Sequence, residues 1–247
     1  IYDALPSVET VVVPIGGGGL ISGIATALKG LNPSVRVIGV QAEGASSVAP
    51  SLSKGERIEL DSVDTIADGI ATRTVGEKTF EVIKERVDEV VTVSDADIAV
   101  AVTTLLERSK TLVEGAGAVP LAALLAGAFE YEDEETIVPV LCGGNIDMNT
   151  LTTVIMRGMI ETGRYLRIRT VLPDRPGALD SLVAVISEQE ANIYAIQHDR
   201  TSRDVSMDDA EIEIDLETRG HDHVTELIDA LETAGYEIEI LTGETEF

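Results

Sequence analysis

Apolar positions along the first two thirds of the chain follow two different spacings. Short continuous apolar runs, such as Val11 to Val13, indicate strands that are buried on both faces. Longer segments with an apolar residue every three or four positions indicate amphipathic helices, and Ser94 followed by Asp95 and Asp97 marks the start of one of them. The strands are predicted near residues 10–15, 35–41, 89–93 and 136–141, and the helices near 18–31, 44–54, 76–86, 95–110, 116–129 and 149–162. This alternation is typical of an α/β fold in which helices cover a mainly parallel sheet.

The pattern changes near Gly163, and the density of charge changes with it. Residues 165–247 hold 20 of the 44 acidic residues in about a third of the length. Strict alternation of acidic and apolar residues from Glu211 to Leu216 predicts a half-buried strand. The elements predicted here are a strand at 165–172, a helix at 178–190, strands at 193–198 and 211–216, a helix at 221–234 and a strand at 236–241. This β-α-β-β-α-β order predicts a ferredoxin-like domain over residues 164–247, after a first domain over residues 1–163.

Four consecutive glycines, Gly16 to Gly19, lie between the first predicted strand and the first predicted helix. A helix N-terminus carries unpaired N–H groups and a partial positive charge, and a chain without Cβ atoms can approach a ligand closely. We therefore expect a phosphate-binding turn, since a tight turn without a ligand would need fewer glycines. Leu20 and Ile21 follow, which fits neither the P-loop of nucleotide-binding proteins nor the dinucleotide fingerprint. The expected phosphate therefore belongs to another kind of ligand.

Charge and cysteine content limit the classes of partner and the cellular compartment that we expect for this protein. The net charge of −26 repels nucleic acids and anionic membranes, so neither is expected as a partner. The uncharged apolar stretches are too short to span a membrane. The single cysteine, Cys142, is compatible with a reducing compartment. We therefore expect a soluble cytoplasmic protein. The many acids and few lysines favour a halophilic protein over an ordinary acidic one. Because the first residue is Ile1, we expect either processing or a longer parent chain.

Four glycine-containing motifs follow one another along the first domain. They are Gly16 to Leu20 with Ser22 and Gly23, Ile66 to Ile70, Glu114 to Ala118, and Cys142 to Asp147. Their order and spacing resemble the fold-type II pyridoxal-phosphate enzymes, and most closely the threonine ammonia-lyase (threonine dehydratase) family. The resemblance covers the carboxyl-terminal part of that family's catalytic domain. In the second domain, Asp174 to Leu179 and Ala191 to Ile193 resemble the ACT domain, an amino-acid-sensing module.

The resemblance assigns cofactor contacts to these motifs. It implies that pyridoxal 5'-phosphate is the cofactor and that its phosphate is held by Gly16, Gly17, Gly18, Gly19 and Leu20. It places Cys142 beside the pyridine nitrogen, where a thiol is a neutral partner that does not keep the nitrogen protonated. The alternative for Cys142 is a small buried residue after a strand. Gly69 is placed near the cofactor face, and Glu114 is either a carboxylate near the cofactor ring or an acid at a helix N-terminus.

Two features depart from the family pattern. The family's Schiff-base lysine lies in an earlier Ser-x-Lys-x-Arg-Gly segment, and none of the lysines of this chain lies in such a sequence. We therefore predict that residues 1–247 contain no catalytic residue and that the chain is inactive when it stands alone. Some relatives bind a divalent cation through acidic residues, and the matching positions here are Gln41, Ala45 and Ser47, which lack carboxylates. We predict no metal site there, nor at His221 and His223, whose spacing makes them diverge on a helix.

The ACT resemblance implies an amino-acid effector site. A turn at Asp174 leads into a helix at Gly177, where free N–H groups can bind an amino-acid carboxylate, although an ordinary helix entry is the alternative. The residues implied are Asp174, Gly177, Ala178, Leu179 and Asn192, with isoleucine or valine as the effector. The family also implies a homodimer or homotetramer.

Together, the motifs lead to the prediction of pyridoxal-phosphate-dependent deamination of L-threonine to 2-oxobutanoate and ammonia. The reaction would serve isoleucine biosynthesis or threonine catabolism, under amino-acid regulation through the ACT domain. Dehydration or racemisation of serine is the alternative within the same family. A non-catalytic amino-acid sensor that keeps the glycine turn as scaffold is the alternative from another class, and a lysine upstream in the encoding gene would discriminate between enzyme and sensor.

Overall fold

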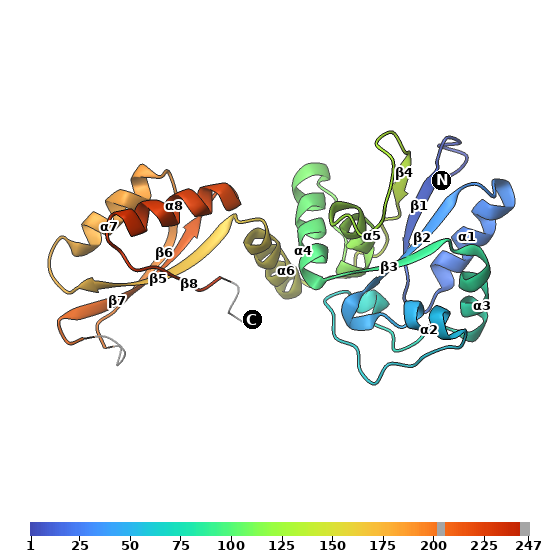
Figure 1. Cartoon of the computed structure of the whole chain (residues 1–247), viewed down its shortest axis with the longest axis horizontal. Coiled ribbons are helices and arrows are strands. Elements are labelled where there is room, and N and C mark those ends of the chain that lie inside the picture. The colour runs from blue at the N-terminus through green and yellow to red at the C-terminus, as the bar shows by residue number, and fades with distance from the viewer. Residues whose placement is uncertain (202–205, 243–247) are drawn as a thin grey trace. The chain divides into compact units, whose positions relative to one another are not determined.

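The computed structural model describes residues 1–201 and 206–242, and the chain divides into two compact units, Ile1–Gly158 and Met159–Phe247 (Figure 1). The boundary expected from the sequence, between residues 163 and 164, stays a prediction. Within the described ranges, none of the helices is long and apolar enough to cross a lipid bilayer.

The N-terminal unit is built on a parallel four-stranded sheet in the order β3-β2-β1-β4. Its strands are β1 (Thr10–Pro14), β2 (Arg36–Ala42), β3 (Glu89–Val93) and β4 (Ile137–Pro139). All five residues of β1 are buried, as the continuous apolar run predicts for a central strand. Because the strands are parallel, their carboxyl ends lie along one edge of the sheet, which is where ligands bind in open α/β folds.

Helices cover both faces of this sheet, and each face has its own apolar core (Figure 1). On one face, α1 (Gly19–Leu31) and α3 (Glu77–Arg86) contribute buried residues such as Ile21 and Ile83. On the other face, α4 (Asp95–Thr104) and α5 (Gly115–Leu125) contribute Ile98 and Val119. The unit also contains η1 (Glu43–Ala45), α2 (Val48–Lys54), η2 (Asp68–Ile70) and η3 (Leu105–Ser109), and the boundary with the second unit falls within α6 (Met148–Glu161).

Two predicted helices differ from the structure in their last turns. The helix predicted at 95–110 is α-helical only to Thr104, then widens into the π-helical turn η3, and ends at Lys110 with a φ of 55°. The helix predicted at 116–129 ends at Leu125, because Gly127 takes the left-handed conformation with a φ of 63°. The first helix therefore reaches its predicted end with a change from α to π geometry, whereas backbone conformation stops the second while the apolar spacing continues.

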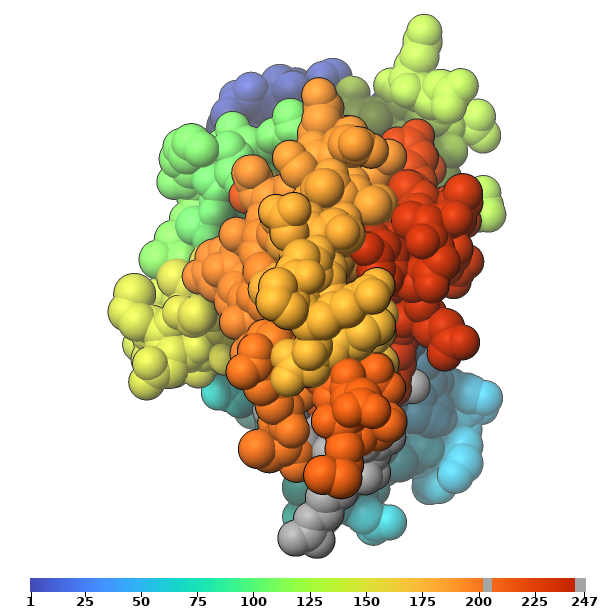
Figure 2. All heavy atoms as spheres, turned by 90° about the vertical axis from the view of Figure 1, so that its left-hand side faces the viewer, coloured from blue at the N-terminus to red at the C-terminus, as the bar shows by residue number. Residues whose placement is uncertain are grey.

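The C-terminal unit has the predicted β-α-β-β-α-β order. An antiparallel four-stranded sheet in the order β6-β7-β5-β8 is formed by β5 (Tyr165–Pro173), β6 (Asn192–Asp199), β7 (Asp209–Glu217) and β8 (Glu239–Ile240). Helices α7 (Ala178–Glu188) and α8 (His221–Thr233) pack on one face of this sheet, around buried residues such as Ile168, Ile214 and Leu227 (Figure 1). In Figure 2, α7 and α8 (red) lie next to each other at the surface. The predicted fold class, an α/β lobe followed by a ferredoxin-like domain, is confirmed.

Candidate functional site

The glycine turn joins the carboxyl end of β1 directly to the N-terminus of α1. Gly18 is the N-cap of α1 and has a φ of 86°, which favours glycine strongly over other residues. A methyl group placed on Gly18 would also lie 2.8 Å from the Cβ atom of Thr79. The first hydrogen bond of the helix runs from Ser22 N to Gly18 O. The N–H groups of Gly19, Leu20 and Ile21 therefore lie before the first bonded turn of α1.

Open space adjoins this turn on the side where Gly17 and Gly19 lack a side chain. A methyl group placed on Gly17 or on Gly19 would meet nothing within 4 Å, and both glycines are exposed. The Leu20 side chain, in the first turn of the helix, is 45% exposed. A helix N-terminus with backbone donors, next to a turn that no side chain fills, can accept an anion such as a phosphate.

Thr79 holds the glycine turn in place from α3. Its hydroxyl donates a hydrogen bond of 2.7 Å to the carbonyl oxygen of Gly17, and Gly76 N donates another of 3.2 Å to the same oxygen. Ser22 Oγ in turn donates to Thr79 O. We did not single out Thr79 from the sequence, because a lone threonine in the first turn of an amphipathic helix gives no local sign that it contacts a loop 62 residues away.

The other three motifs converge on the same edge of the sheet. Strands β1 and β4 are neighbours, with Val12 opposite Pro139, so the segments that follow them emerge side by side. A methyl group placed on Gly16 would lie 3.1 Å from Ile70 Cα, and one placed on Gly69 would lie 2.6 Å from Glu114 Oε1. The structure thus brings the glycine turn, the Asp68–Ile70 turn, Glu114 and the segment after β4 together.

Glu114 links two of these segments through its carboxylate. It occupies the N-cap position of α5, where its carbonyl oxygen accepts hydrogen bonds from Gly117 N and Ala118 N. Its side chain does not turn back to this helix; instead, Oε2 accepts a hydrogen bond of 3.1 Å from Asn145 N. The structure therefore places Glu114 at a helix N-terminus, with its carboxylate directed at the Cys142–Asn145 segment, and its position near a cofactor ring stays a prediction.

Cys142 is half-buried and its thiol is free. Burial raises the pKa of this thiol, and the nearby Glu114 carboxylate raises it further. Both causes disfavour the thiolate, so Cys142 remains a neutral thiol at physiological pH. This neutral state is what the predicted role beside a pyridine nitrogen requires.

Replacement of Glu114 by glutamine is expected to lower the pKa of the Cys142 thiol. The substitution removes the negative charge that disfavours the thiolate, while burial, the larger cause, remains. The pH dependence of the reaction between the protein and a small disulfide reagent measures this pKa, and the signal is unambiguous because the chain has one cysteine.

The matched control for this experiment is Asp68→Asn, which removes an exposed carboxylate from the neighbouring turn. It should leave the thiol pKa unchanged. An unchanged thiol pKa in the Glu114→Gln variant would contradict the close approach of the carboxylate and the thiol.

The five lysines of the chain lie on helices or at a helix end. The Lys29 ammonium is 2.7 Å from Asp88 Oδ2, and Lys110 Nζ donates to the carbonyl oxygen of Glu107. Lys54, Lys78 and Lys84 are exposed residues of α2 and α3. The prediction that a reactive lysine is not supplied by residues 1–247 stays a prediction.

The residues predicted for the effector site fall at two ends of the ACT-like sheet. Asp174 follows β5, where its N–H donates to Asp208 O and its carboxylate pairs with Arg200 at 3.2 Å. Gly177 is the N-cap of α7 with a φ of 90°, and Ala178 and Leu179 form the first turn of that helix. Asn192 starts β6 and lies opposite Glu217, to which its amide donates at 3.3 Å. Since Glu217 pairs with Tyr165, at the beginning of β5, a single copy of the domain does not bring Asn192 next to Asp174.

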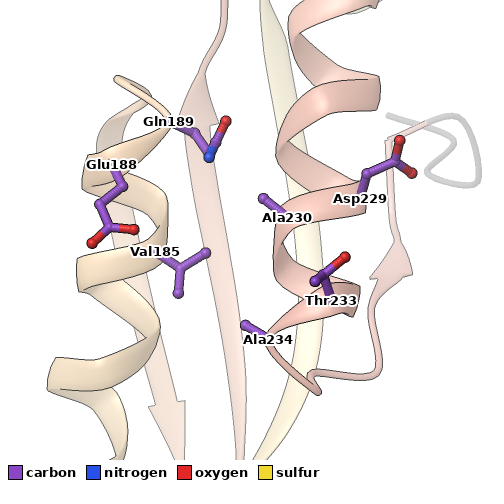
Figure 3. Close-up of a pocket in the computed structure, with 7 residues that line it drawn as sticks. All are labelled: Val185, Glu188, Gln189, Asp229, Ala230, Thr233 and Ala234. Carbon is purple, nitrogen blue, oxygen red and sulfur yellow. The ribbon is translucent and has the colours of Figure 1, made fainter.

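Two pockets of the C-terminal unit lie away from these predicted residues. One, of about 370 Å³, lies between α7 and α8 over Val185 and Ala230, with the carboxylates of Glu188 and Asp229 supplied by opposite helices (Figure 3). The other, of about 560 Å³, lies at the N-terminus of α8 beside His221 and His223. His223 is buried there, and both of its ring nitrogens have partners: Nδ1 accepts a hydrogen bond from Arg219 N, and Nε2 donates to Gln189 O. Its ring is thus used as a structural link. Among the described residues, no group of three or more His, Cys, Asp or Glu side chains is placed to hold a metal ion.

Comparison with known families divides the chain as the fold does. Residues 1–143 match the family of pyridoxal-phosphate dependent enzymes, and residues 163–235 match the ACT domain family. An L-threonine ammonia-lyase of Geobacter sulfurreducens is 47% identical over 241 residues, which are 98% of this chain and 60% of that protein. An L-threonine ammonia-lyase of Thermotoga maritima is 43% identical over the same shares. The chain therefore spans about 60% of the length of these curated relatives.

Solved structures show the same relationship. A threonine deaminase from tomato (Solanum lycopersicum) is 37% identical with a TM-score of 0.61, over 63% of this chain and 46% of that chain. A serine racemase from maize is 37% identical with a TM-score of 0.57, over 64% of this chain and 49% of that chain. The sequence motifs, the fold and both family matches agree, and the chain belongs to the pyridoxal-phosphate dependent enzyme family, as a homologue of the threonine ammonia-lyases that carries an ACT domain.

Proposed function

We propose that this chain is the phosphate-binding and regulatory part of an enzyme that deaminates L-threonine to 2-oxobutanoate and ammonia. The observation that supports the proposal most strongly is the convergence of Gly16, Gly69, Glu114 and the Cys142 segment at the carboxyl edge of one parallel sheet. The names of the two curated relatives, both L-threonine ammonia-lyases, support threonine as the substrate.

The residues of the site fit pyridoxal 5'-phosphate. Gly17 and Gly19 leave open space beside the N-terminus of α1, which suits the close approach of a phosphate. Cys142 offers a neutral thiol whose pKa is raised, so it can hydrogen-bond a pyridine nitrogen without protonating it. When bound, pyridoxal phosphate supplies the electron-withdrawing group that makes the α-proton of an amino acid acidic. In this proposal Gly16 to Leu20 fix the phosphate, Gly69 and Glu114 lie along the cofactor, and Cys142 limits its electron withdrawal to what elimination needs.

The proposal leaves the base that removes the α-proton to a lysine outside residues 1–247. It follows that the chain alone does not catalyse the reaction, whereas a protein that also contains the lysine-bearing segment does. Serine is the second candidate substrate, and the similarity to a serine racemase favours testing it.

We also propose that the ACT-like domain binds isoleucine or valine between two copies of the chain. Asp174, Gly177, Ala178 and Leu179 surround the N-terminus of α7, which suits a carboxylate. Asn192 lies at the other end of the sheet, so an effector that contacts both requires Asn192 from a second copy. This arrangement is consistent with the homodimer or homotetramer expected from the family.

Incubation with L-threonine tests the proposed function. A protein that includes the lysine-bearing segment should release 2-oxobutanoate, and residues 1–247 alone should release none. Isoleucine or valine should change the rate, and Asn192→Ala should weaken that change. Release of no 2-oxo acid from threonine or serine by the lysine-containing protein would overturn the enzyme proposal in favour of an amino-acid sensor.

A further inference from the structure

The side chain of Gln41 ties the carboxyl ends of two strands to the turn that follows them. Gln41 is fully buried near the end of β2. Its Oε1 accepts a hydrogen bond of 2.8 Å from Val48 N, the first N–H of α2. Its Nε2 donates to Ala45 O at 3.0 Å and approaches Ile15 O at 3.5 Å. Ile15 is the residue directly before the glycine turn, so one amide contacts both the turn after β2 and the base of the phosphate-binding segment.

This arrangement needs an amide and would not tolerate a carboxylate unaided. An amide offers a donor and an acceptor at its two ends, which matches two carbonyl oxygens on one side and an N–H on the other. A glutamate in the same position would satisfy Val48 N but would direct a negatively charged oxygen at the carbonyl oxygens of Ala45 and Ile15. Such a buried contact between acceptors is strongly unfavourable unless a proton or a cation lies between them.

The same turn matches the position where some relatives bind a divalent cation, and the residues of this chain do not fit one. Gln41 and Ser47 supply no charge, and the Ala45 carbonyl already accepts from Gln41 Nε2 and Ser47 N. The Ser47 hydroxyl is fully buried and has no hydrogen-bond partner within the described part of the chain, so it adds at most one neutral ligand. A hard divalent cation prefers several oxygens that include carboxylates.

We propose that the Gln41 amide takes the place of a divalent cation in this chain and positions the glycine turn without metal. Gln41 is a positioning residue, because it acts on the backbone of Ile15, Ala45 and Val48 and leaves contact with any ligand to the turn itself. The inference stands apart from the proposed reaction, since it concerns how the carboxyl ends of β1 and β2 are joined.

Thermal unfolding of the 247-residue chain tests this proposal at one fixed ionic strength, set with KCl. The unfolding temperature of the wild type should be the same in EDTA, Mg²⁺ and Ca²⁺. Gln41→Glu should unfold more than about 4 °C lower in EDTA, as a loss above roughly 1 kcal/mol predicts for a chain of this size. Mg²⁺ or Ca²⁺ should restore most of that difference, because the new carboxylate and the two carbonyl oxygens then have a cation to share.

Two further variants separate this effect from general screening of the acidic surface. Gln197→Glu adds the same charge at an exposed position of β6 and should show no recovery specific to divalent cations. Gln41→Leu removes all the hydrogen bonds without adding charge, so it should be destabilised in every buffer. Stabilisation of the wild type by Mg²⁺ or Ca²⁺ beyond that given by KCl would overturn the proposal. A Gln41→Glu variant that no divalent cation restores, including one that fails to fold in their presence, would overturn it as well.

Discussion

Replacement of Gly117 by alanine is expected to lower the free energy of unfolding by about 3 kcal/mol, near the upper end for overpacking a filled core. Gly117 is buried in the first turn of α5, and a methyl group there would lie 1.8 Å from Cys142 O and 3.1 Å from Gly143 O. Both contacts are backbone atoms, which cannot rotate away as a side chain can. The segment that carries Cys142 must therefore shift, and the site shifts with it.

Denaturant unfolding measures the loss of stability, and the reaction rate of Cys142 with a thiol reagent reports the displacement. The rate should rise, because the shifted segment exposes the thiol. Gly30→Ala is the matched control: Gly30 is an exposed residue of α1 with nothing within 4 Å of an added methyl group. Alanine there should stabilise the helix by up to about 1 kcal/mol. A Gly117→Ala variant as stable as Gly30→Ala would contradict the close packing of α5 against the Cys142 segment.

Replacement of Asp215 by asparagine is expected to destabilise the protein by about 2 kcal/mol at neutral pH, below the value for a fully buried pair because Arg167 is partly exposed. Asp215 lies opposite Arg167 across β5 and β7, on the face of the sheet that α7 and α8 leave open. The two side chains form a bidentate pair, with Arg167 Nη2 donating to Asp215 Oδ2 at 3.0 Å, and Arg167 also donates to the Tyr165 hydroxyl. Asp215 itself is 8% exposed, so little water can reach this position to solvate the Arg167 guanidinium once the carboxylate charge is removed.

This contribution should fade in acid. The hydrogen bonds from Arg167 hold the pKa of the Asp215 carboxyl below its ordinary value. The stability that the pair provides is therefore fully present above the unfolded-state pKa of about 3.9 and is lost as the pH falls through the lower folded-state value. The stability difference between wild type and Asp215→Asn, measured by denaturant unfolding, should stay constant from neutral pH down to mildly acidic pH and then shrink.

The matched control for Asp215 is Glu239→Gln, which removes a half-exposed partner of Arg169 on the same open face. It should change the free energy of unfolding by less than about 0.5 kcal/mol. A difference for Asp215→Asn that is equally small, or that grows as the pH falls, would show that the buried pair does not stabilise the sheet.

Local patterns were sufficient to predict most of the elements. The continuous apolar run at the start of β1 and the alternation in β7 indicate their strands because side-chain burial follows the period of the strand itself. The start of α4 is equally local, since Ser94 and Asp97 form a reciprocal capping box within four residues. The end of α5 was missed, because it depends on the left-handed backbone at Gly127 and not on apolar spacing, and the π-helical turn that follows α4 was not predicted either.

The sequence by itself determined the fold class, the order of the elements and the presence of a glycine turn at Gly16 to Gly19 between a strand and a helix, because each of these depends on neighbouring residues and on the periods of helix and strand. Only the tertiary structure decided that Glu114 reaches Asn145, that Thr79 holds Gly17, that Gln41 joins the ends of β1 and β2, and that Asn192 lies far from Asp174. These relationships concern residues that are far apart in the sequence, so the helix and strand periods do not predict them. In the N-terminal unit they exist because parallel strands bring their carboxyl ends to one edge of the sheet. In the C-terminal unit, β5 and β6 both pair antiparallel with β7 and therefore run parallel to each other, so Asn192 lies level with the start of β5 whereas Asp174 follows its end.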